Sequence, residues 1–485
     1  MVQNYRIVRN PIEKSSKATL KSNSKHICFS DYILTKLFGT NGVRGIINKE
    51  LTVDIALRLS RATGTLLGPG KIAIARDSRM GGEMFTHTLI SGLNSTGCSV
   101  VDLGPVPTPT LQYMIPRLDC IAGVMVTASH NPPHFNGIKV IGSNGIEASR
   151  ETEDEIEKVY HSNQFTAADW DKIGEFAHYD SAVDVYLAGI KSLIDIDKIK
   201  EKKLKVIVDG ANSVGSVVTP RLLREIGCSV VSLNSQLDGH FPGRNPEPIP
   251  ENLKDLSAAV TAMGADLGIA HDGDADRATF VDETGRVLWG DQSFALIASR
   301  VLAKKRGSTL VTPVSSGRLI EDVVRNAGAK IDWTEVGSVV VSHRIEEIGA
   351  ELGGEENGGV FYPDHQPVRD GAMTASQVVE MIALEGKTLS QLVSELPTYF
   401  NTKVKVEVPQ EKKEPLLEVL LDLTKDMKRI TIDGVKIVRD EGWILIRPSG
   451  TEPIYRCFAE GKTQDTADSL SKDGVELIER AKKML

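Results

Sequence analysis

Three stretches of the chain repeat one order of elements, and this repeat constrains the fold more than any other feature. Each copy reads as a strand, a polar turn, a helix, a Gly-containing turn and a second strand. The copies are KIAIARDSRMGGEMFTHTLISGLNSTGCSVVDLG (71–104), LKVIVDGANSVGSVVTPRLLREIGCSVVSLN (204–234) and the looser STLVTPVSSGRLIEDVVRNAGAKIDWTEVG (308–337). Because a helix separates the two strands of each copy, we expect mainly parallel pairing. A period of about one hundred residues indicates duplicated domains and not a solenoid.

After Pro397 the repeat gives way to short alternating strands. The expected elements are strands at 402–408, 432–440, 442–448 and 454–460, a helix around Leu416 to Met427, and a terminal helix. Short strands with an Ile-Asp-Gly turn favour an antiparallel sheet. The predicted fold class is therefore α/β, with three similar α/β domains of mixed, mainly parallel sheets and a smaller C-terminal α+β domain.

The composition is that of an ordinary globular protein, with 41% hydrophobic and 25% charged residues. A length of 485 residues allows several domains. The net charge of −8 and the absence of a long basic stripe in the body argue against nucleic acid as the main partner. No apolar run approaches the ~18 residues that span a bilayer, and the N-terminal segment lacks the apolar region of a signal peptide. We expect no membrane partner and a cytoplasmic location.

The five cysteines are scattered along the chain and form no CxxC pair. They are Cys28, Cys98, Cys120, Cys228 and Cys457. This usage favours reduced, mostly structural thiols, and it argues against a disulfide framework or a zinc site.

Residues 1–36 differ in composition from the rest of the chain. They carry seven Lys and Arg against two acidic residues, together with five serines. We expect this basic extension to be mostly disordered. An overcalled start, an expression remnant and an organelle transit peptide all remain open explanations.

The segment TASHNPPHFNGIKV (127–140) contains several reactive side chains within a short loop. The apolar run at 121–126 reads as a buried strand, and the run after Gly137 reads as another. Polar residues at a strand end are where sheet enzymes expose reactive groups. Ser129 could therefore be a covalent nucleophile or a phosphoryl carrier. A Ser/Asn-rich turn without chemistry is the alternative.

The segment DGDADR (272–277) places Asp272, Asp274 and Asp276 at alternate positions after an apolar strand. Three hard oxygen donors suit Mg²⁺ or Ca²⁺. An EF-hand is one alternative, with Glu283 at its twelfth position. However, Arg277 stands where the EF-hand turn needs Gly, and residues 278–289 read as a hairpin instead of an exit helix. A purely structural acidic turn is the other alternative.

Two further segments suit a phosphorylated sugar. RPSGTEP (447–453) offers the guanidinium fork of Arg447, the hydroxyls of Ser449 and Thr451, and close backbone approach at Gly450. GGEENGG (353–359) offers acceptors and an amide among glycines, which suit sugar hydroxyls. Its polar residues are Glu355, Glu356 and Asn357. The Gly-Lys-Thr at 386–388 is no Walker A loop, because the earlier Gly is missing, so a nucleotide kinase is disfavoured.

In their order along the chain, 127–140, 272–277, 353–359 and 447–453, the four segments resemble the motifs of the α-D-phosphohexomutases, and the resemblance extends from LFGTNGVRG (37–45) to the C-terminus. It implies a four-domain, heart-shaped layout with one motif from each domain facing a central cleft. The expected ranges are 37–180 with the phosphoserine loop, 181–291 with the metal loop, 292–398 with the sugar loop and 399–485 with the phosphate loop.

The resemblance also implies roles for single residues. Phosphorylated Ser129 would carry the phosphoryl group and share one Mg²⁺ with the three aspartates, beside Arg277. The loop at 447–453 would hold the non-reacting phosphate of the substrate. The loop at 353–359 would read the sugar, with Glu355 as the main hydroxyl ligand. Many members have Ser and then Gly-His where this chain has Asn357, Gly358 and Gly359, which leaves the sugar open.

Arg44 and Lys139 are the candidates for acid–base chemistry that the family suggests. A Lys of ordinary pKa, ~10.4, acts as a base at neutral pH only in a cationic or desolvated setting. Which of the two moves the proton is left open. His130 either positions the phosphate or is structural.

The sequence thus predicts a phosphohexomutase that interconverts hexose 6-phosphate and hexose 1-phosphate through a 1,6-bisphosphate. Phosphoglucosamine mutase is the first expectation, and phosphomannomutase/phosphoglucomutase is the alternative. The expected partner is a small phosphosugar, and the expected state is a monomer or homodimer. A non-catalytic sugar-phosphate-binding protein and a calcium-binding module are the other classes. The former would lack a Ser, Asp or Arg of the motifs, and none is missing.

Overall fold

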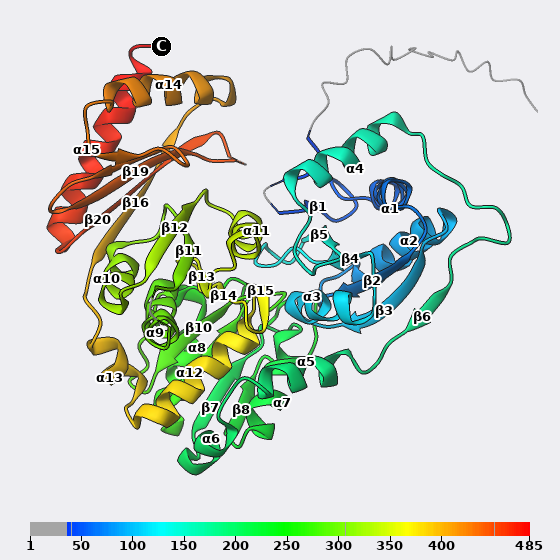
Figure 1. The fold of residues 1–485 in the computed structure, drawn as a ribbon, viewed down its shortest axis with the longest axis horizontal. Helices are drawn as coiled ribbons and strands as arrows, with labels where there is room; N and C mark the ends of the chain where they lie inside the picture. Colours follow the sequence, from blue (N-terminus) through cyan, green and yellow to red (C-terminus); the bar gives the residue numbers. More distant parts are fainter. Residues whose placement is uncertain (1–35, 40, 306, 451) are drawn as a thin grey trace, which may run out of the picture. The chain divides into compact units, whose positions relative to one another are not determined.

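The computed structural model describes residues 36–39, 41–305, 307–450 and 452–485. The predicted basic extension therefore lies outside the described residues, apart from Lys36, and so does Cys28. Leu37–Leu485 form one unit, whose described residues build four sheets in chain order (Figure 1).

The first sheet has the strand order β1-β5-β4-β2-β3-β6. Its strands are β1 (Val43–Ile46), β2 (Lys71–Arg76), β3 (Ser99–Pro105), β4 (Ala122–Val126), β5 (Phe135–Gly142) and β6 (Phe176–His178), and its helices are α1 (Val53–Leu67), α2 (Gly82–Ser95), α3 (Thr108–Arg117) and α4 (Arg150–Ser162). Strands β4, β2, β3 and β6 pair in parallel, whereas β5 pairs antiparallel with both of its neighbours, β4 and β1. Side chains of a strand alternate between faces. Accordingly, Ile72 and Ile74 pack in the core with α1 and α2, and Ala73 and Ala75 pack in the core with α3.

The second and third sheets also mix parallel and antiparallel strands. The second has the order β10-β9-β7-β8 and the third the order β12-β11-β13-β14-β15. The strands are β7 (Lys205–Asp209), β8 (Ser229–Leu233), β9 (Leu267–His271), β10 (Ala278–Asp282), β11 (Thr309–Pro313), β12 (Lys330–Thr334), β13 (Leu352–Gly354), β14 (Val360–Tyr362) and β15 (Gln366–Arg369). Among these described strands, the antiparallel pairs are β9 with β10, β13 with β14 and β14 with β15, and the other pairs are parallel.

Each copy of the sequence repeat forms two parallel neighbouring strands joined by a helix. The three units are β2-α2-β3, β7-α7-β8 with α7 (Gly215–Glu225), and β11-α10-β12 with α10 (Arg318–Ala327). The predicted parallel pairing is confirmed. The other helices of this part of the chain are α5 (Ala182–Lys191), α6 (Ile196–Lys202), η1 (Pro250–Asn252), α8 (Lys254–Met263), α9 (Gly290–Ala303), α11 (Ser338–Ile348), α12 (Gly371–Glu385) and α13 (Leu389–Ser394).

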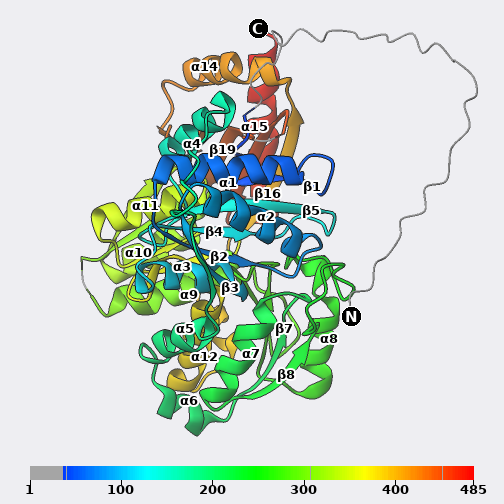
Figure 2. The same cartoon turned by 90° about the vertical axis from the view of Figure 1, so that its right-hand side faces the viewer.

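Helix α12 connects the third domain to the second. It belongs to the third domain in sequence, but it packs on α6 and α7 of the second domain (Figure 2). Its residues 371–382 are all buried. One apolar cluster runs from Met114 of α3 through Leu222 of α7 to Met373 of α12. The first three domains therefore share a continuous core.

The C-terminal sheet is antiparallel throughout, with the order β16-β20-β19-β18-β17. Its elements are β16 (Phe400–Glu407), η2 (Gln410–Lys412), α14 (Lys413–Leu423), β17 (Arg429–Ile430), β18 (Val435–Val438), β19 (Gly442–Pro448), β20 (Ile454–Gly461) and α15 (Gln464–Lys482). Leu416 and Leu420 of α14 pack with Ile478 of α15 over this sheet in a core of their own. The predicted fold class is confirmed, although the short strand β17 was not predicted. The bounds of the four domains stay a prediction.

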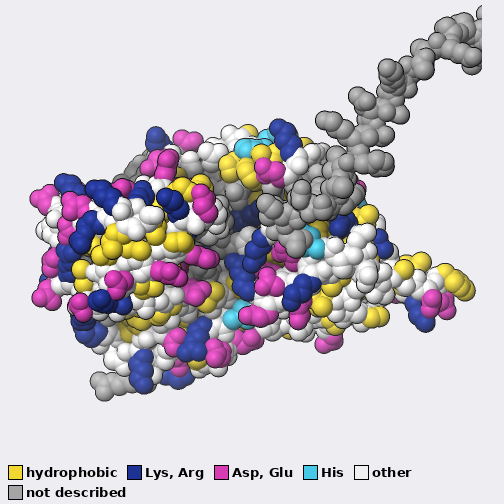
Figure 3. All heavy atoms as spheres, turned by 90° about the horizontal axis from the view of Figure 1, so that it is seen from above, with side chains coloured by type: hydrophobic (Ala, Val, Ile, Leu, Met, Phe, Trp, Pro, Cys, Tyr) yellow, Lys and Arg dark blue, Asp and Glu magenta, His cyan; other side chains and the backbone are white. Residues whose placement is uncertain are grey.

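Two surface properties bear on possible partners. No helix among the described residues is long and apolar enough to cross a membrane. On the face drawn in Figure 3, Lys and Arg side chains are interspersed with Asp and Glu. This mixture is typical of a solvated surface.

Candidate functional site

Ser129 sits in the loop between β4 and β5 with a strained backbone. Its φ is +48°, in the left-handed region that a residue with a side chain seldom adopts. The backbone N–H of Ser129 donates a hydrogen bond to the side-chain hydroxyl of Thr127 at 2.9 Å. The Ser129 hydroxyl donates to Oδ2 of Asp272 at 2.8 Å, and both residues are buried. The serine of the first domain thus meets the metal loop of the second.

One arginine holds the serine loop in this shape. The terminal nitrogens of Arg79 donate to four main-chain carbonyls of the loop, those of Ser129, Asn131, Pro132 and Phe135, at 2.6 to 3.0 Å. The Nε of Arg79 pairs with Oδ2 of Asp77 at 3.2 Å. The same carboxylate oxygen accepts a hydrogen bond from the Thr127 hydroxyl at 2.6 Å. Both charged side chains are fully buried, so each needs the other. The strain at Ser129 is therefore supported by a rigid network.

The three aspartates of the metal loop converge, as the alternate spacing predicts. One oxygen of each of Asp272, Asp274 and Asp276 lies within 4.8 Å of the others, and all three residues are buried. Among the described residues, Oδ1 of Asp274 and Oδ1 of Asp276 have no hydrogen-bond partner. Unpartnered buried carboxylate oxygens are costly unless a cation takes them up. The donor set fits a hard divalent cation that prefers oxygen ligands.

The chain after the metal loop excludes an EF-hand. Strand β10 is followed by a turn in which the N–H of Asp282 donates to the carbonyl of Arg286, and Val281 bridges Val287 antiparallel. An EF-hand needs a helix in this position. The predicted hairpin is confirmed.

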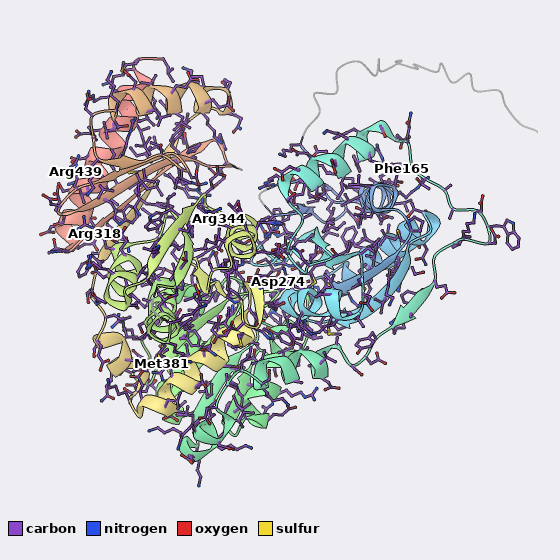
Figure 4. The ribbon with its side chains drawn as sticks, in the orientation of Figure 1. Phe165, Asp274, Arg318, Arg344, Met381 and Arg439 are labelled. Atoms are coloured by element: carbon purple, nitrogen blue, oxygen red, sulfur yellow. The ribbon has the colours of Figure 1, made fainter. Side chains whose placement is uncertain are left out.

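Three buried cations, one from each of the first three domains, surround the aspartates (Figure 4 marks Asp274). Nζ of Lys139 lies 2.9 Å from Oδ2 of Asp274. Arg277 pairs with Asp272 at 3.0 Å, and Arg369 pairs with Asp276 at 2.5 Å. Buried charges persist only when they are paired in this way.

The setting of Lys139 keeps it protonated in this arrangement. Burial lowers the pKa of Lys139, but the carboxylates of Asp274, Asp276 and Glu147 outweigh burial, so that the pKa lies above its ordinary value. Lys139 is therefore a cation and a potential proton donor here. The cationic surroundings that would make it a base are outweighed by acids.

Arg44 and His130 flank the serine. Nη1 of Arg44 donates to Oδ1 of Asn131 at 2.7 Å and to the carbonyl of Ala128 at 3.3 Å. Nδ1 of His130 lies 3.4 Å from Oγ of Ser129. Burial, helped by Arg277 and Arg44, lowers the pKa of His130 to about 3. The imidazole is thus neutral and suited to hydrogen bonding.

The two glutamates of the sugar loop have different partners. The loop joins β13 to β14, and Glu355 is buried in an ion pair with Arg369 at 3.2 Å. Because Arg369 also pairs with Asp276, Glu355 is linked to the metal loop. Glu356 instead pairs with Lys403 of β16 at 3.0 Å. Oδ1 of Asn357 accepts from the N–H of Gly359 at 3.0 Å.

The predicted phosphate loop lies in the C-terminal domain, at the end of β19. Nη2 of Arg447 pairs with Oδ2 of Asp433 at 2.8 Å. The N–H of Ser449 donates to the carbonyl of Ile454 at 2.9 Å, and Gly450 is exposed. Thr451 lies outside the described residues. The contacts above join Ser129, Lys139, Glu355 and the metal loop, whereas Arg447 stands apart from that network.

Models of one family match all four parts of the chain. They describe phosphoglucomutase/phosphomannomutase α/β/α domains I, II and III at residues 35–167, 184–285 and 289–400, and the C-terminal domain at 404–477. The chain belongs to the phosphoglucomutase/phosphomannomutase family. As a phosphohexomutase it is an isomerase that transfers phosphate within its substrate. A solved N-acetylphosphoglucosamine mutase of Aspergillus fumigatus, in complex with GlcNAc-6P and magnesium, shares the fold with 16% identity and a TM-score of 0.61, over 92% of this chain and 96% of that one.

Relatives of this phosphohexomutase have two kinds of name. The chain is 46% identical to "Phosphoglucomutase/phosphomannomutase" of Thermococcus kodakarensis, over 92% of this chain and 99% of that protein. It is 44% identical to "Phosphoglucosamine/phosphogalactosamine mutase" of Sulfurisphaera tokodaii, with the same coverage. A solved phosphoglucomutase/phosphomannomutase family protein of Burkholderia thailandensis is 29% identical with a TM-score of 0.83, over 92% of this chain and 98% of that one.

Sequence reasoning missed several residues at the centre of this phosphohexomutase. Arg79 lies in the polar turn of the first repeat, at a strand end, and that position is the signal that could have found it. Thr108, whose hydroxyl donates to Oδ2 of Asp274 at 2.7 Å, begins a helix. Arg369 ends a short strand, and its sequence neighbours carry no pattern that marks it. Its role depends on contacts between domains.

Proposed function

We propose that this phosphohexomutase moves a phosphoryl group between O6 and O1 of an aldohexose through phosphorylated Ser129. The observation that carries the proposal is the 2.8 Å hydrogen bond from the Ser129 hydroxyl to Asp272. The Ser129 hydroxyl lies against a carboxylate of the candidate metal site, whereas the other hydroxyl of the motif loop, that of Thr127, donates to Asp77. A serine without chemistry would need neither this contact nor a strained backbone.

The metal proposal rests on Asp272, Asp274 and Asp276, with a phosphate oxygen on Ser129 as a further ligand. When bound there, Mg²⁺ neutralises charge on the transferring group and polarises the P–O bond. Two orphaned, buried carboxylate oxygens support this assignment. Lys139, Arg277 and Arg369 each pair with one of the aspartates, so the phosphate on Ser129 would supply the further negative charge that favours a divalent cation there.

The proposed reaction conserves phosphate over one cycle. A substrate hydroxyl attacks the phosphorus of phosphorylated Ser129, the bond from phosphorus to the serine oxygen breaks, and the proton of the substrate hydroxyl ends on that serine oxygen. The resulting 1,6-bisphosphate turns around, and Ser129 takes back the phosphoryl group from the other end. Arg44 and Lys139 remain the two candidates for proton transfer. His130 is proposed to hold the phosphate by a hydrogen bond, and Arg277 to stabilise charge that develops beside Asp272.

Substrate recognition is proposed to come from two loops. Arg447, Ser449, Gly450 and Thr451 would hold the non-reacting phosphate, which must compete with Asp433 for the guanidinium of Arg447. Glu355 and Asn357 would contact sugar hydroxyls. Glu356 pairs with Lys403 of the C-terminal domain, so we propose that it supports the loop and does not contact the sugar itself.

Glucosamine phosphate is the substrate we propose, and a hexose 1,6-bisphosphate is the proposed intermediate and activator. The proposal draws on relatives named "Probable phosphoglucosamine mutase", one of them 42% identical. Phosphoglucomutase/phosphomannomutase activity is the second candidate, favoured by the 46% identical relative of that name. A cytoplasmic location and a monomeric or dimeric state stay predictions.

Initial rates on glucosamine, glucose and mannose phosphates, with catalytic bisphosphate and Mg²⁺ present, test both candidates. Peptide mass analysis of the same preparation locates phosphate. We expect the highest kcat/KM for glucosamine phosphate and a phosphate on Ser129. Preference for glucose or mannose would replace the first candidate by the second. Turnover of none of the three, by protein that carries Mg²⁺ and phosphate, would contradict the proposal.

A further inference from the structure

A cavity of about 480 Å³ lies between α10 of the third domain and the C-terminal sheet. Figure 4 labels two of its lining residues, Arg318 on α10 and Arg439 after β18. Its cationic lining residues are Arg318, Arg325, Lys428, Lys436, Arg439 and Lys462. Only three carboxylates, those of Glu321, Asp322 and Asp440, line it as well. The cavity is therefore positive in a chain whose net charge is −8.

Half of these six cations have no acidic partner among the described residues. The guanidinium of Arg318 donates to the main-chain carbonyls of Asp440 at 2.9 Å and Gly442 at 3.1 Å, and also to that of Arg439. Carbonyl groups orient the guanidinium but leave its charge in place. Among the described residues, Lys428 and Lys462 form no ion pair. By contrast, Arg325 pairs with Asp322 of the lining, and Arg439 pairs with Asp473, which lies outside the lining, at 2.5 Å.

Lys436 is the buried member of the set. It is 1% exposed, and its Nζ lies over the rings of Trp333 and Trp443 at 4.6 and 4.5 Å. It donates to the carbonyl of Ser316 at 2.9 Å, and the nearest carboxylate, that of Glu321, is 3.9 Å away. Burial lowers the pKa of Lys436 to about 8. An anion in the cavity would further stabilise this cation, whose close contacts are a carbonyl and two π faces and whose one carboxylate partner is 3.9 Å away.

The cavity is distinct from the proposed phosphate loop. Trp443 lines the cavity near the start of β19, and Arg447 lies four residues later on the same strand. At ~3.3 Å per residue, this spacing separates them by about 13 Å along the strand. The loop and the cavity thus lie toward opposite ends of the C-terminal sheet.

We propose that this cavity binds a small anion with two phosphate groups. Two groups are inferred because the cations come from two sides, Arg318 and Arg325 from α10 and Lys428, Arg439 and Lys462 from the C-terminal domain. The volume is that of a site for a small organic ligand, and it is large for one phosphate. Such a ligand joins the third domain to the domain that carries Arg447, and it binds separately from the substrate.

Calorimetric titration with pyrophosphate, in chelator, tests the site. The Lys428→Glu/Lys462→Glu variant reverses two exposed cavity charges. The matched control, Lys425→Glu/Lys482→Glu, makes the same change in net charge on the same domain, at lysines that pair with Asp422 and Glu479 outside the cavity. An Arg447→Ala variant removes the cation of the phosphate loop. None of the four lysines belongs to the proposed catalytic site.

We expect pyrophosphate binding that survives in Arg447→Ala, weakens at least about tenfold in the cavity variant and changes less than about twofold in the control. Hexose 1,6-bisphosphate and inorganic phosphate complete the series, and tighter binding of the bisphosphate identifies a sugar-borne source. Binding lost with Arg447→Ala, or weakened equally in the control, would overturn the proposal. Inorganic phosphate that binds as tightly as pyrophosphate would overturn the assignment of two groups.

Discussion

The three α/β domains and the C-terminal domain are joined to their neighbours by different forces. Met373 of α12 lies in a core that continues through the first, second and third domains. Leu420 of α14 lies in a core confined to the C-terminal domain. The junction between the third and fourth domains has a small apolar cluster, in which Val314 packs with Trp443 and Leu445. Other contacts there are polar, such as Arg318 with Gly442, Lys436 with Ser316, and the Val336 N–H with Asp433.

This difference separates two tasks of the proposed enzyme. The serine, the aspartates and their cations lie where three domains share one core, so their geometry is held by dense packing. The phosphate loop lies on a domain with a core of its own and a more polar junction. Polar groups can exchange each other for water at small net cost, so such a junction opens more easily than a core. We therefore expect the serine, the aspartates and their cations to stay fixed relative to one another, and the phosphate loop to move relative to them.

Ser129→Ala gives the largest expected effect. Loss of the phosphoryl carrier should lower kcat by several orders of magnitude, while phosphosugar binding through the C-terminal domain persists. Steady-state kinetics and calorimetric binding measure the two quantities. Ser91→Ala, on an exposed helix position, is the control. Near-wild-type turnover by Ser129→Ala would end the phosphoenzyme proposal.

Asp274→Asn tests the metal at the shared core. A neutral amide replaces an anionic ligand and also breaks the pair with Lys139, so Mg²⁺ affinity should fall at least about tenfold. Activity against Mg²⁺ concentration, after chelation, gives the measurement. Asp255→Asn, exposed on α8, should behave as wild type. Full activity of the wild type in chelator would refute the metal site.

Met373→Ala and Leu420→Ala compare the two cores directly. Each should lower the free energy of unfolding of its own core by about 2–5 kcal/mol. Scanning calorimetry should show that Met373→Ala shifts the transition of the three-domain part and Leu420→Ala that of the C-terminal domain. If both variants shift one common transition equally, the two cores unfold as one unit and the comparison fails.

Arg447→Lys probes the adjustable side. The ammonium keeps the charge but loses the fork, so KM should rise by about tenfold, with Mg²⁺ affinity unchanged. Steady-state kinetics on a phosphosugar and a Mg²⁺ titration check this. Arg480→Lys on the exposed face of α15 serves as the control. An unaltered KM would show that Arg447 does not hold the substrate.

Glu356→Gln should have the smallest effect. Its pair with Lys403 is partly exposed, and such pairs contribute little, so the ratio of kcat/KM between sugars should change by no more than about twofold. Glu355→Gln, which breaks a buried pair, is the comparison and should change the ratio more. If Glu356→Gln changes the ratio more than Glu355→Gln does, then Glu356 and not Glu355 reads the sugar.

Much of the fold was predictable because its signals are local. The three βαβ copies differ in detail but keep apolar runs and turns at matching distances, and each folds into two parallel strands beside one helix. The spacing of Asp272, Asp274 and Asp276 also carried its own geometry, since alternate residues of one loop can turn toward one point. The short alternating strands after residue 400 predicted an antiparallel sheet, because this pattern is also local in the sequence.

The sequence by itself determined the four domains, the serine loop and the acidic loop, because short-range periodicity and turn chemistry encode them. Only the tertiary structure decided the partners of those groups. Arg79 binds the carbonyl of Ser129, 50 residues away in sequence. Arg369 pairs with both Asp276 and Glu355, whereas Glu356, the next residue, pairs with Lys403. Such pairings depend on which domain surfaces meet, and a surface is built from residues that no local spacing relates.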